Sequence, residues 1–347
     1  MPLGAGAVLP LSVSLGDPAG IGPEVVAKCW ENRHVEGLPP FVAIGDPQSI
    51  SAVSATPIAV VEDPEEGAEA FANGLPVIAI ECDGEIVPGK PTSDGARCSY
   101  DSLELAVGLA RSGSVAAVVT GPVSKQQLYQ VGFTHPGQTE FVAERCGVSR
   151  DNVAMMLAGP TLRTVPVTTH IPLSEAAAAL SVEIVASRGR AALRGLIRNF
   201  GIDNPRLAVS GLNPHAGEGG ALGREDIDII APAIELLRSE GWFVTGPHPA
   251  DTMFHERARA HYDAALCMYH DQALIPLKAL HFDEGVNVTL GLPIVRTSPD
   301  HGTAFDIAGQ DLATPTAMAT AMHCATEAAN HRRRLAEKGR TGMAIGK

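Results

Sequence analysis

Short apolar runs alternate with amphipathic stretches along most of the chain. The runs are rich in Val, Ile, Leu and Ala and end in Gly, Pro, Asn or Asp, which is typical of buried strands. Between them, apolar residues recur at the i, i+3, i+4 spacing of helices. Strands that alternate with helices predict βαβ units, so we expect an α/β fold with mainly parallel sheets.

The apolar pattern gives approximate bounds for each element. Strands are predicted at 9–15, 41–44, 77–80, 115–120, 206–209, 242–245, 264–269, 286–290 and 294–296. Helices are predicted from 25, after 125 and from 141 onward, and at 100–110, 182–200, 224–241, 274–280 and 316–335. The segments 152–157 and 162–168 predict an antiparallel hairpin. Ser181 suits an N-cap, and Pro276 suits the first turn of its helix.

A glycine-rich segment at 16–24 lies between the first predicted strand and the first predicted helix. Free N–H groups at the start of a helix attract anions, so this segment could hold a phosphate or a dinucleotide. Its spacing matches neither G-x-G-x-x-G nor a P-loop. A tight structural turn therefore stays open as the alternative.

The charge balance excludes some partners. The chain has 347 residues, enough for two domains, and a formal net charge of -13. Nucleic acids and anionic membranes need a basic surface, so we expect neither as a partner. A local cluster of Arg and Lys could still hold an anionic substrate. The basic run 332–334 is interpreted as the solvated end of the last helix, where the helix dipole favours cations.

Cysteine usage and hydropathy indicate a compartment. The six cysteines form no C-x-x-C pair, which is typical of a reducing environment without a disulfide framework. The apolar stretch 3–15 lacks the basic start of a signal peptide and is interpreted as the first strand. No apolar run approaches the length of a membrane span. We therefore expect a cytoplasmic protein.

Three histidines each follow a predicted strand, namely His170, His215 and His270. Parallel α/β sheets place their ligands at the carboxyl ends of strands. Three neutral imidazoles at one such edge would bind a divalent metal and leave positions open for a substrate. Separate surface or capping histidines are the alternative, because the spacing carries no local signature such as H-E-x-x-H.

Further polar residues could bind an anionic, oxygen-rich substrate. Arg296 suits a bidentate contact with carboxylate or phosphate, Lys278 supplies a point charge, and Asn287 offers an amide. Gln138 and Thr139 open a predicted helix whose N–H groups could hold a phosphate. Ordinary surface charge and a simple helix cap are the alternatives.

A series of segments in this order resembles the 4-hydroxythreonine-4-phosphate dehydrogenase family of pyridoxal phosphate synthesis, nearly end to end. The segments are Gly-Asp-Pro-Ala-Gly-Ile-Gly-Pro-Glu at 16–24, Thr-Gly-Pro-Val-Ser-Lys at 120–125, Gly-Gln-Thr-Glu at 137–140, Thr-His-Ile-Pro at 169–172, Asn-Pro-His-Ala-Gly-Glu at 213–218, Pro-Ala-Asp-Thr at 249–252, Tyr-His-Asp-Gln at 269–272 and Thr-Ser-Pro-Asp-His-Gly-Thr-Ala at 297–304. Isocitrate- and isopropylmalate-type dehydrogenases are wider relatives.

The resemblance implies two α/β/α domains with the active site in the cleft between them. The cofactor-side domain would comprise 1–130 plus 292–347. The domain for metal, substrate and dimerisation would comprise 131–291. The family is homodimeric and shares its active site between subunits.

The resemblance also assigns site residues. It makes His170, His215 and His270 the ligands of one Zn, Mg or Co ion, with the third ligand from the neighbouring subunit. Substrate contacts fall on Gln138, Thr139, Lys278, Asn287 and Arg296. The cofactor, NAD or NADP, would lie against Gly16, Asp17, His301, Gly302 and Asp306.

One position departs from the family pattern. The family usually has Gly-His-Thr-Glu where this chain has Gly-Gln-Thr-Glu, with Gln138 in place of the histidine. Glutamine keeps its hydrogen-bonding capacity but carries neither a titratable proton nor a charge. The substitution therefore bears either on the role of the position or on the identity of the substrate.

The resemblance implies oxidation and decarboxylation of 4-phosphooxy-L-threonine to 3-amino-2-oxopropyl phosphate and CO2, with NAD as oxidant. Lys278 and Asp251 are both candidates for proton transfer. Sister activities on D-threonate or D-erythronate 4-phosphate, or on a dihydrodiol of terephthalate, remain alternatives. A phosphate acyltransferase-like enzyme and a non-catalytic ligand-binding homologue are alternatives of other classes.

Overall fold

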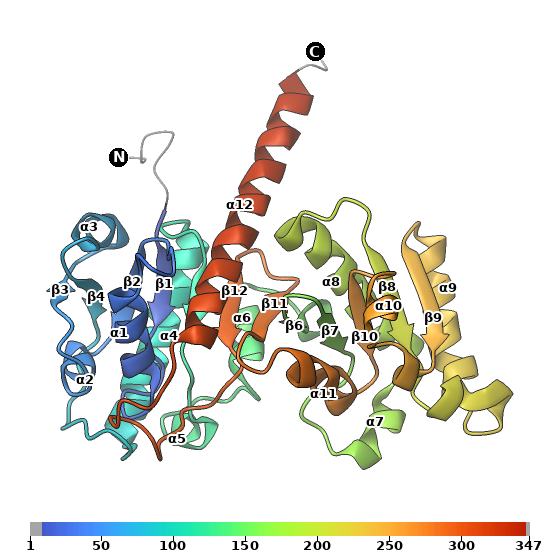
Figure 1. Cartoon of the computed structure of the whole chain (residues 1–347), viewed down its shortest axis with the longest axis horizontal. Helices are drawn as coiled ribbons and strands as arrows, with labels where there is room; N and C mark the ends of the chain where they lie inside the picture. The colour runs from blue at the N-terminus through green and yellow to red at the C-terminus, as the bar shows by residue number, and fades with distance from the viewer. Residues whose placement is uncertain (1–8, 345–347) are drawn as a thin grey trace. The chain divides into compact units, whose positions relative to one another are not determined.

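The structure is a computed structural model that describes residues 9–344, with side chains as far as Lys338. The chain divides into two compact units (Figure 1). The first comprises Met1–Cys146 and Pro293–Ala329, and the second comprises Gly147–Leu292 and Asn330–Lys347. The border near residue 146 lies later than the expected 130, and the end of the last helix groups with the second unit.

The first unit contains a parallel sheet in the order β3-β4-β2-β1-β5-β12. Its strands are β1 (Leu11–Ser14), β2 (Phe41–Gly45), β3 (Ile58–Val60), β4 (Leu75–Ala79), β5 (Val118–Thr120) and β12 (Arg296–Pro299). Every residue of β1, β2, β5 and β12 is buried. Parallel strands covered on both faces are expected to be apolar without alternation, which is why the short apolar runs predict them.

Helices of the first unit begin at identifiable caps. The helices are α1 (Gly22–Glu31), α2 (Pro47–Ser51), α3 (Pro64–Ala70), α4 (Ser93–Ser112), α5 (Lys125–Gln130) and α6 (Gln138–Arg145). The side chains of Asp46, Asp63, Thr92 and Ser124 accept hydrogen bonds from backbone N–H groups in the first turns of α2, α3, α4 and α5. Such caps satisfy donors that the helix leaves open.

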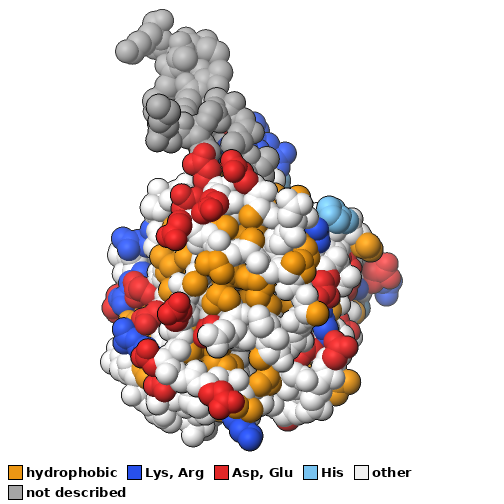
Figure 2. Space-filling model, turned by 90° about the vertical axis from the view of Figure 1, so that its left-hand side faces the viewer, with side chains coloured by type: hydrophobic (Ala, Val, Ile, Leu, Met, Phe, Trp, Pro, Cys, Tyr) orange, Lys and Arg blue, Asp and Glu red, His pale blue; other side chains and the backbone are white. Residues whose placement is uncertain are grey.

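The strand β3 is the edge of the first sheet, and it is only partly buried. Val60 on this strand is 61% exposed. Figure 2 views the side of the molecule at the left of Figure 1, where β3 lies, and shows apolar side chains at its centre with acidic ones around them. The sequence analysis did not predict this strand, although residues 58–61 form a short apolar run.

The second unit contains a mixed sheet in the order β11-β6-β7-β10-β8-β9. Its strands are β6 (Ala154–Ala158), β7 (Arg163–Pro166), β8 (Arg206–Ser210), β9 (Phe243–His248), β10 (Ala264–Cys267) and β11 (Val286–Leu290). The strands β7, β10, β8 and β9 run parallel, whereas β6 pairs antiparallel with both β7 and β11. The predicted hairpin and the mainly parallel α/β class are both confirmed.

Helices of the second unit match the sequence in part. They are α7 (Leu173–Ala179), α8 (Val182–Phe200), α9 (Ala231–Ser239), α10 (Glu256–Arg259), α11 (His270–Leu280) and the last helix α12 (Thr316–Ala344), which begins in the first unit. Short helical turns are η1 (Arg150–Asn152), η2 (Pro214–Gly220), η3 (Asp226–Ile230) and η4 (Ala250–Thr252). The helix predicted at 224–241 is π-helical in η3 before α9 begins. Ser181 caps α8 as predicted, because its side chain accepts a hydrogen bond from Ile184 N.

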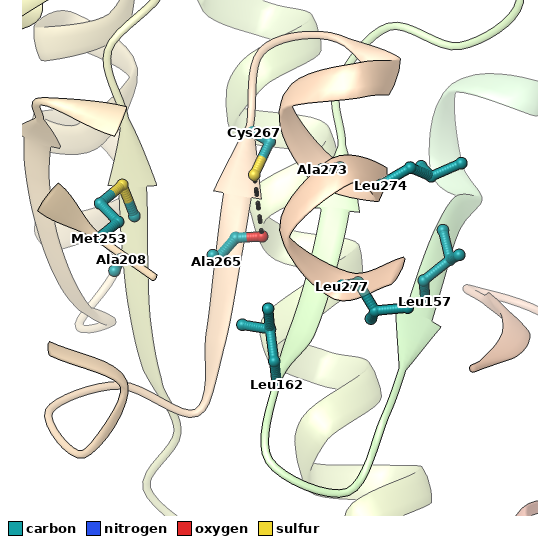
Figure 3. Packing of buried hydrophobic residues seen from close by; sticks show 9 residues of the cluster. All are labelled: Leu157, Leu162, Ala208, Met253, Ala265, Cys267, Ala273, Leu274 and Leu277. Carbon is teal, nitrogen blue, oxygen red and sulfur yellow. Dashed lines mark hydrogen bonds between the residues drawn. The ribbon is translucent and has the colours of Figure 1, made fainter. Parts of the chain in front are cut away.

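The start of α11 was predicted wrongly. The helix begins at His270 rather than near residue 274, so Pro276 lies inside it instead of in its first turn. Its apolar face, which includes Ala273 and Leu277, packs on Leu157 and Ala265 of the sheet (Figure 3). This packing offsets the hydrogen bond that a proline removes from a helix.

Other differences are smaller. The sequence pattern missed α2, α3, α7 and α10, and it placed the last strand at 294–296 rather than at Arg296–Pro299. The six cysteines are free. Among the described residues, no helix is both long and apolar enough to cross a bilayer. The stretch 3–8, interpreted as part of the first strand, lies outside the described residues.

Candidate active site

The three candidate metal ligands lie at one edge of the second sheet. The strands β7, β10 and β8 are neighbours and run parallel, so their carboxyl ends point the same way. His170 follows β7, His270 follows β10 and His215 follows β8. The three imidazoles are therefore presented where open α/β sheets hold their ligands.

Two of these histidines face each other. The ring centroids of His170 and His270 are 5.8 Å apart. Both rings line a cavity of about 180 Å³, together with Thr168, Tyr269 and Asp271. The Nδ1 atom of His270 lies 2.7 Å from Asp271 Oδ1. A carboxylate at one ring nitrogen fixes the orientation of an imidazole whose other nitrogen binds a metal.

His215 lies in the loop formed by η2. Its φ of 54° is left-handed, as is the same angle of His170. Non-glycine residues in this region cost free energy and often mark functional sites. The buried Asp226 holds the start of the loop, since its carboxylate accepts hydrogen bonds from Leu212 N at 2.9 Å and Asn213 N at 3.2 Å.

One chain does not assemble the full ligand set. Within the part of the chain that the structure describes, no three His, Cys, Asp or Glu side chains form a group that could hold a metal ion. The close pair is His170 with His270. The three-histidine site thus stays a prediction.

Gln272 joins two of the histidine loops, and the sequence reasoning did not single it out. Its Oε1 accepts hydrogen bonds from Ser210 Oγ and from Met268 N, both at 2.6 Å. Its Nε2 donates to Gly211 O at 2.8 Å. Ser210 ends β8 and Met268 follows β10, so one buried amide ties together the bases of the His215 and His270 loops. In the sequence, the feature that could have pointed to Gln272 is its place two residues after the strand-end histidine His270.

Arg296 is buried in the first unit beside Gln138, the residue that differs from the expected family pattern. Its Nη2 donates hydrogen bonds to Thr120 Oγ1 at 2.6 Å and to Gln138 Oε1 at 2.9 Å. Gln138 Nε2 in turn donates to Gly121 O at 3.1 Å. Burial lowers the pKa of Arg296 to about 10, which the nearby Glu140 carboxylate opposes. The guanidinium therefore remains a cation at neutral pH.

The helix α6 begins where the sequence placed a phosphate contact. Gln138 and Thr139 are its first two residues, and the N-cap Gly137 supplies no side-chain cap. A Cβ atom at Gly137 would lie 3.1 Å from Glu140 Oε2 and 3.7 Å from Lys125 Nζ, so a carboxylate of the same helix already lies beside this ammonium. Lys125, at the start of α5, was not among the expected site residues; a lysine soon after the end of β5 was the available signal. Open N–H groups beside an ammonium suit an anion.

Two further substrate candidates lie in the second unit. Lys278 is on α11, with its Nζ 5.9 Å from the ring centroid of Phe282. Asn287 is in β11, and its buried Oδ1 has no hydrogen-bond partner among the described residues. A buried acceptor without a partner costs free energy unless a ligand satisfies it. Asp251, the other candidate for proton transfer, is exposed in η4.

The two expected cofactor loops adjoin within the first unit. Ile21 N donates a hydrogen bond to Thr303 O at 3.0 Å. Gly16 has a φ of 75°, and a Cβ there would lie 2.2 Å from Pro122 O, so only glycine fits. Asp17 is buried, which raises the pKa of its carboxyl to about 6, although a hydrogen bond from Ala19 N opposes the shift.

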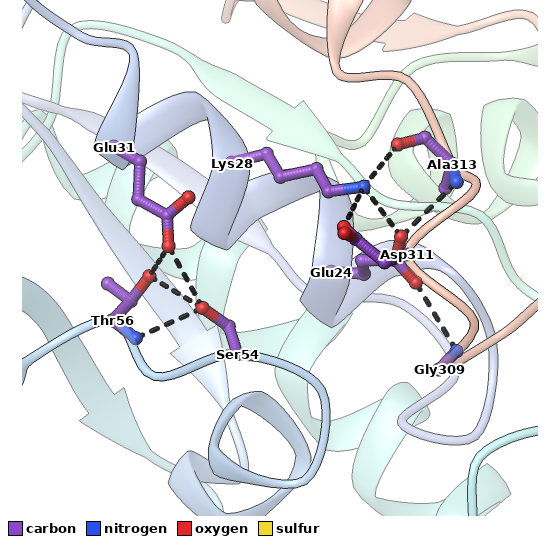
Figure 4. Close-up of polar contacts among 8 residues, drawn as sticks. All are labelled: Glu24, Lys28, Glu31, Ser54, Thr56, Gly309, Asp311 and Ala313. Atoms are coloured by element: carbon purple, nitrogen blue, oxygen red, sulfur yellow. Dashed lines mark hydrogen bonds and ion pairs between the residues drawn. The ribbon is translucent and has the colours of Figure 1, made fainter.

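The remaining cofactor candidates lie in the second of these loops. His301 Nδ1 is 3.1 Å from Gly302 O, while Gly302 and Asp306 are exposed. The buried Glu24 anchors the segment that follows, because it accepts hydrogen bonds from Gly309 N and Ala313 N, both at 3.2 Å (Figure 4). Lys28 Nζ lies 2.8 Å from Glu24 Oε1 on the same helix.

Known proteins resemble this chain over almost its whole length. A 4-hydroxythreonine-4-phosphate dehydrogenase of Zymomonas mobilis is 53% identical over 96% of this chain and 99% of its own. The crystal structure of the Klebsiella pneumoniae enzyme of that name superposes with a TM-score of 0.84 at 36% identity, covering 94% of this chain and 99% of that one. A terephthalate 1,2-cis-dihydrodiol dehydrogenase from Burkholderia xenovorans gives 0.64 at 31% identity, covering 92% and 98%.

The profile of one protein family matches residues 38–325, which is most of the chain. It describes the pyridoxal phosphate biosynthetic protein PdxA. The segments on which the resemblance rested and the strand-end histidines lie within or beside this range. The chain therefore belongs to the family of the pyridoxal phosphate biosynthetic protein PdxA.

Proposed function

We propose that this protein is an NAD(P)-dependent, metal-requiring 4-hydroxythreonine-4-phosphate dehydrogenase that works in the cytoplasm. The observation that carries the proposal is the facing pair His170 and His270 at the carboxyl edge of the sheet. The pair occurs in a chain 53% identical to a relative of that name. The product of oxidation and loss of CO2 would be 3-amino-2-oxopropyl phosphate.

The types of these residues suit a divalent metal. His170, His215 and His270 would hold it, with Asp271 orienting the His270 ring. Imidazole ligands favour Zn²⁺ or Co²⁺ over Mg²⁺, which prefers oxygen. When bound, the metal polarises the substrate hydroxyl and takes up charge during decarboxylation, while NAD(P) accepts the hydride.

The chain's own side chains would hold the two ends of the substrate. Arg296 offers a buried, always charged guanidinium, and the start of α6 at Gln138 and Thr139 offers N–H groups to a phosphate. Lys278 would contribute a second cation and Asn287 an unsatisfied acceptor for a substrate N–H or O–H. Lys278 and Asp251 are the two candidates for moving the proton. Lys278 is a proposed substrate contact, and Asp251 is exposed to solvent.

The loops at 16–24 and 301–309 would hold the cofactor. Support comes from their contact through Ile21 and Thr303 and from the close backbone approach at Gly16. Gly16, Asp17, His301, Gly302 and Asp306 are the proposed contacts. A glycine-lined turn that precedes a helix lets a backbone approach a pyrophosphate closely.

We also propose a homodimer that shares the metal site. Large apolar side chains are exposed in the histidine cavity, on α11 and just after α11: Leu173 is 70% exposed, Ile275 66% and Phe282 75%. Leu173 lines that cavity, and Ile275 lies on α11, which begins at His270. Grouped exposed apolar side chains are typical of a protein–protein interface. A partner at this face could supply the ligand that one chain lacks.

The test is NADH formation from 4-phosphooxy-L-threonine with Zn²⁺ or Co²⁺ present. Activity with this substrate supports the proposal, and His215→Ala should abolish it across a full metal titration. A wild-type rate in that variant would refute the metal assignment. Acyl transfer to phosphate without NADH formation would favour the acyltransferase class, and metal binding without any turnover would favour a ligand-binding homologue.

A second substrate class is favoured by a specific residue. Gln138 replaces the histidine usual in the family, and a dihydrodiol dehydrogenase is 31% identical to this chain. The same assay with D-threonate 4-phosphate, D-erythronate 4-phosphate and the terephthalate dihydrodiol decides between them. A higher kcat/KM for any of these than for 4-phosphooxy-L-threonine would replace the first substrate.

A further inference from the structure

Three arginines share one face of α8. Arg190, Arg194 and Arg198 are spaced i, i+4 and i+8, which stacks their side chains along the helix. With Arg332 of α12 they line a cavity of about 320 Å³ in the second unit. None of the residues around this cavity lines the histidine cavity. The arginines therefore form a cluster that the proposed reaction does not use.

Few carboxylates lie near the arginines of α8. Arg190 pairs with Glu240 through Nε contacts of 2.8 and 2.9 Å. No Asp or Glu lines the cavity. Among the described residues, Arg194 and Arg198 form no hydrogen bond or ion pair, although the charge of Arg194 helps to lower the pKa of Glu240. The whole chain, by contrast, carries a net charge of -13. A concentration of cations in such a chain is not explained by overall composition.

Arg332 was expected to be solvated, and the structure corrects this. Its side chain is half-buried, and burial lowers its pKa to about 9, with the nearby charge of Arg198 lowering it further. Its Nε donates a hydrogen bond at 2.8 Å to Oδ1 of the buried Asn199. Only Arg333 and Arg334 of the basic run are exposed. The Arg332 guanidinium therefore lies beside the like charge of Arg198, at the cavity that the α8 arginines line.

The favourable interaction of cations with the carboxyl end of a helix accounts for part of the pattern. Arg198 lies in the last turn of α8, where the helix dipole stabilises it. This effect fades within one turn, so it does not explain Arg194 or the burial of Arg332. The neutral side chains Asn152 and Ser187 complete a polar lining suited to oxygen-rich ligands.

We propose that this cavity binds a small polyanion bearing phosphate or carboxylate groups, at a site separate from the candidate active site. Planar guanidinium groups hold such groups through paired hydrogen bonds. The volume suits a ligand the size of a diphosphate. The proposal does not rest on the assignment of the reaction, since it involves none of the same residues.

Pyrophosphate is a suitable probe for calorimetric titration of the full chain at constant ionic strength. Arg194 and Arg198 are exposed, so the double variant Arg194→Ala/Arg198→Ala removes two cations without disturbing the core. We expect its pyrophosphate affinity to fall at least about tenfold, in line with the loss of paired charged hydrogen bonds. The exposed pair Arg257→Ala/Arg333→Ala removes the same charge outside the cavity and should leave the affinity unchanged.

Further outcomes decide the proposal. A second variant, Arg194→Lys, keeps the positive charge but loses the paired N–H donors of the guanidinium. Its affinity for pyrophosphate should lie between those of the wild type and the double variant. Lys278→Met should leave this binding intact, which separates the cavity from the proposed substrate site. Equal losses in both double variants would mean general charge attraction. No saturable pyrophosphate binding, or unchanged binding in the cavity variant, would overturn the proposal.

Discussion

The side-chain oxygen of Gln138 accepts a hydrogen bond from Nη2 of the buried Arg296 at 2.9 Å. The same amide donates through Nε2 to Gly121 O. Glutamine thus serves as an acceptor toward a cation and as a donor toward a carbonyl. A neutral histidine, which the resemblance to the family leads one to expect here, can also accept at one nitrogen and donate at the other. With glutamine, the hydrogen bonds to Arg296 and to Gly121 are made by a side chain that has no titratable group.

The variant Gln138→His should introduce a pH dependence that the wild type lacks. A protonated imidazole cannot accept the hydrogen bond from Arg296, and the guanidinium charge repels it. We expect kcat/KM to stay within a few-fold of wild type at pH 8 and to fall as the pH drops through about 6.5 or below. The control Gln126→His places the same residue on the surface. Superimposable pH profiles would show that position 138 does not touch the reacting complex.

Gln272 offers a test of how the histidine loops are positioned. The variant Gln272→Met keeps the length of the side chain but leaves Ser210 Oγ and Met268 N without their acceptor. We expect metal affinity to fall about 10- to 100-fold, as for other residues that orient ligands indirectly. The free energy of unfolding should fall by about 1–3 kcal/mol for the unsatisfied groups.

Metal titration of folded protein measures the first effect and chemical denaturation the second. Gln126→Met is the surface control, and it should change neither. A Gln272→Met variant that is destabilised but binds metal with wild-type affinity would limit this amide to a structural role.

The fold was predictable where burial produced a continuous apolar run. The buried strand β2 and the capped helix α8 were placed nearly to the residue. The helices α2 and α3 were missed because they are too short to show periodicity. Their Asp-Pro starts, at Asp46 and Asp63, were the signal that could have found them, since an aspartate cap followed by proline opens a helix.

The site was predictable in its placement but not in its geometry. Strand-end positions for His170, His215 and His270 follow from the apolar runs before them. The side-chain directions do not, because two of these residues take left-handed backbone angles that loop contacts impose. Arg332 was expected in solvent for a related reason: its hydrogen bond to Asn199 joins residues that are far apart in the sequence. Tertiary contacts of this kind leave no periodic trace in the sequence.

A shared metal site predicts complementation between inactive variants. His170→Ala and His270→Ala should each be inactive as homodimers. If the His170 and His270 ligands of one ion come from different chains, a refolded equimolar mixture regenerates one native site in each heterodimer. The expected activity is then about a quarter of wild type.

The close approach of His170 and His270 within one chain makes this experiment informative. A mixture without activity would mean that both ligands of one ion come from the same chain. The control mixes His170→Ala with itself after the same refolding treatment. Any activity in that control would reveal contamination by wild-type protein.

Asp17→Asn should stabilise the protein in a defined pH range. Burial raises the pKa of this carboxyl from 3.8 to about 6, so the folded state binds the proton more tightly than the unfolded state. Ionisation therefore costs stability as the pH rises from about 4 to about 6, and the full cost persists above this range. The neutral amide avoids a cost on the order of 3 kcal/mol at pH 7.5 and gains little at pH 4.

Denaturant unfolding of both proteins at the two pH values measures the difference. The hydrogen bond from Ala19 N can be kept by the amide oxygen, so the loop should remain in place. A weaker affinity for NAD in this more stable variant would support the proposed cofactor contact. An equal gain in stability at pH 4 and pH 7.5 would show that the carboxyl is not the source.

Asn287→Leu separates binding from stability in the same way. Asn287 Oδ1 is a buried acceptor with no partner among the described residues, so an apolar side chain of similar size removes a penalty. We expect the free energy of unfolding to stay constant or to rise by about 1 kcal/mol. If the acceptor serves the substrate, kcat/KM should fall at least about tenfold, because the bound ligand is left without this hydrogen bond.

Thr164→Val provides the matched control. Thr164 Oγ1 in β7 is also buried without a partner among the described residues, but Thr164 is not a proposed substrate contact. Its replacement should raise stability by a similar amount and leave kcat/KM unchanged. A loss of activity in both variants would point to a general change in the sheet, whereas full activity in Asn287→Leu would remove Asn287 from the substrate site. Only a stable Asn287→Leu protein with impaired turnover, beside a fully active Thr164→Val protein, fits an acceptor kept for the ligand.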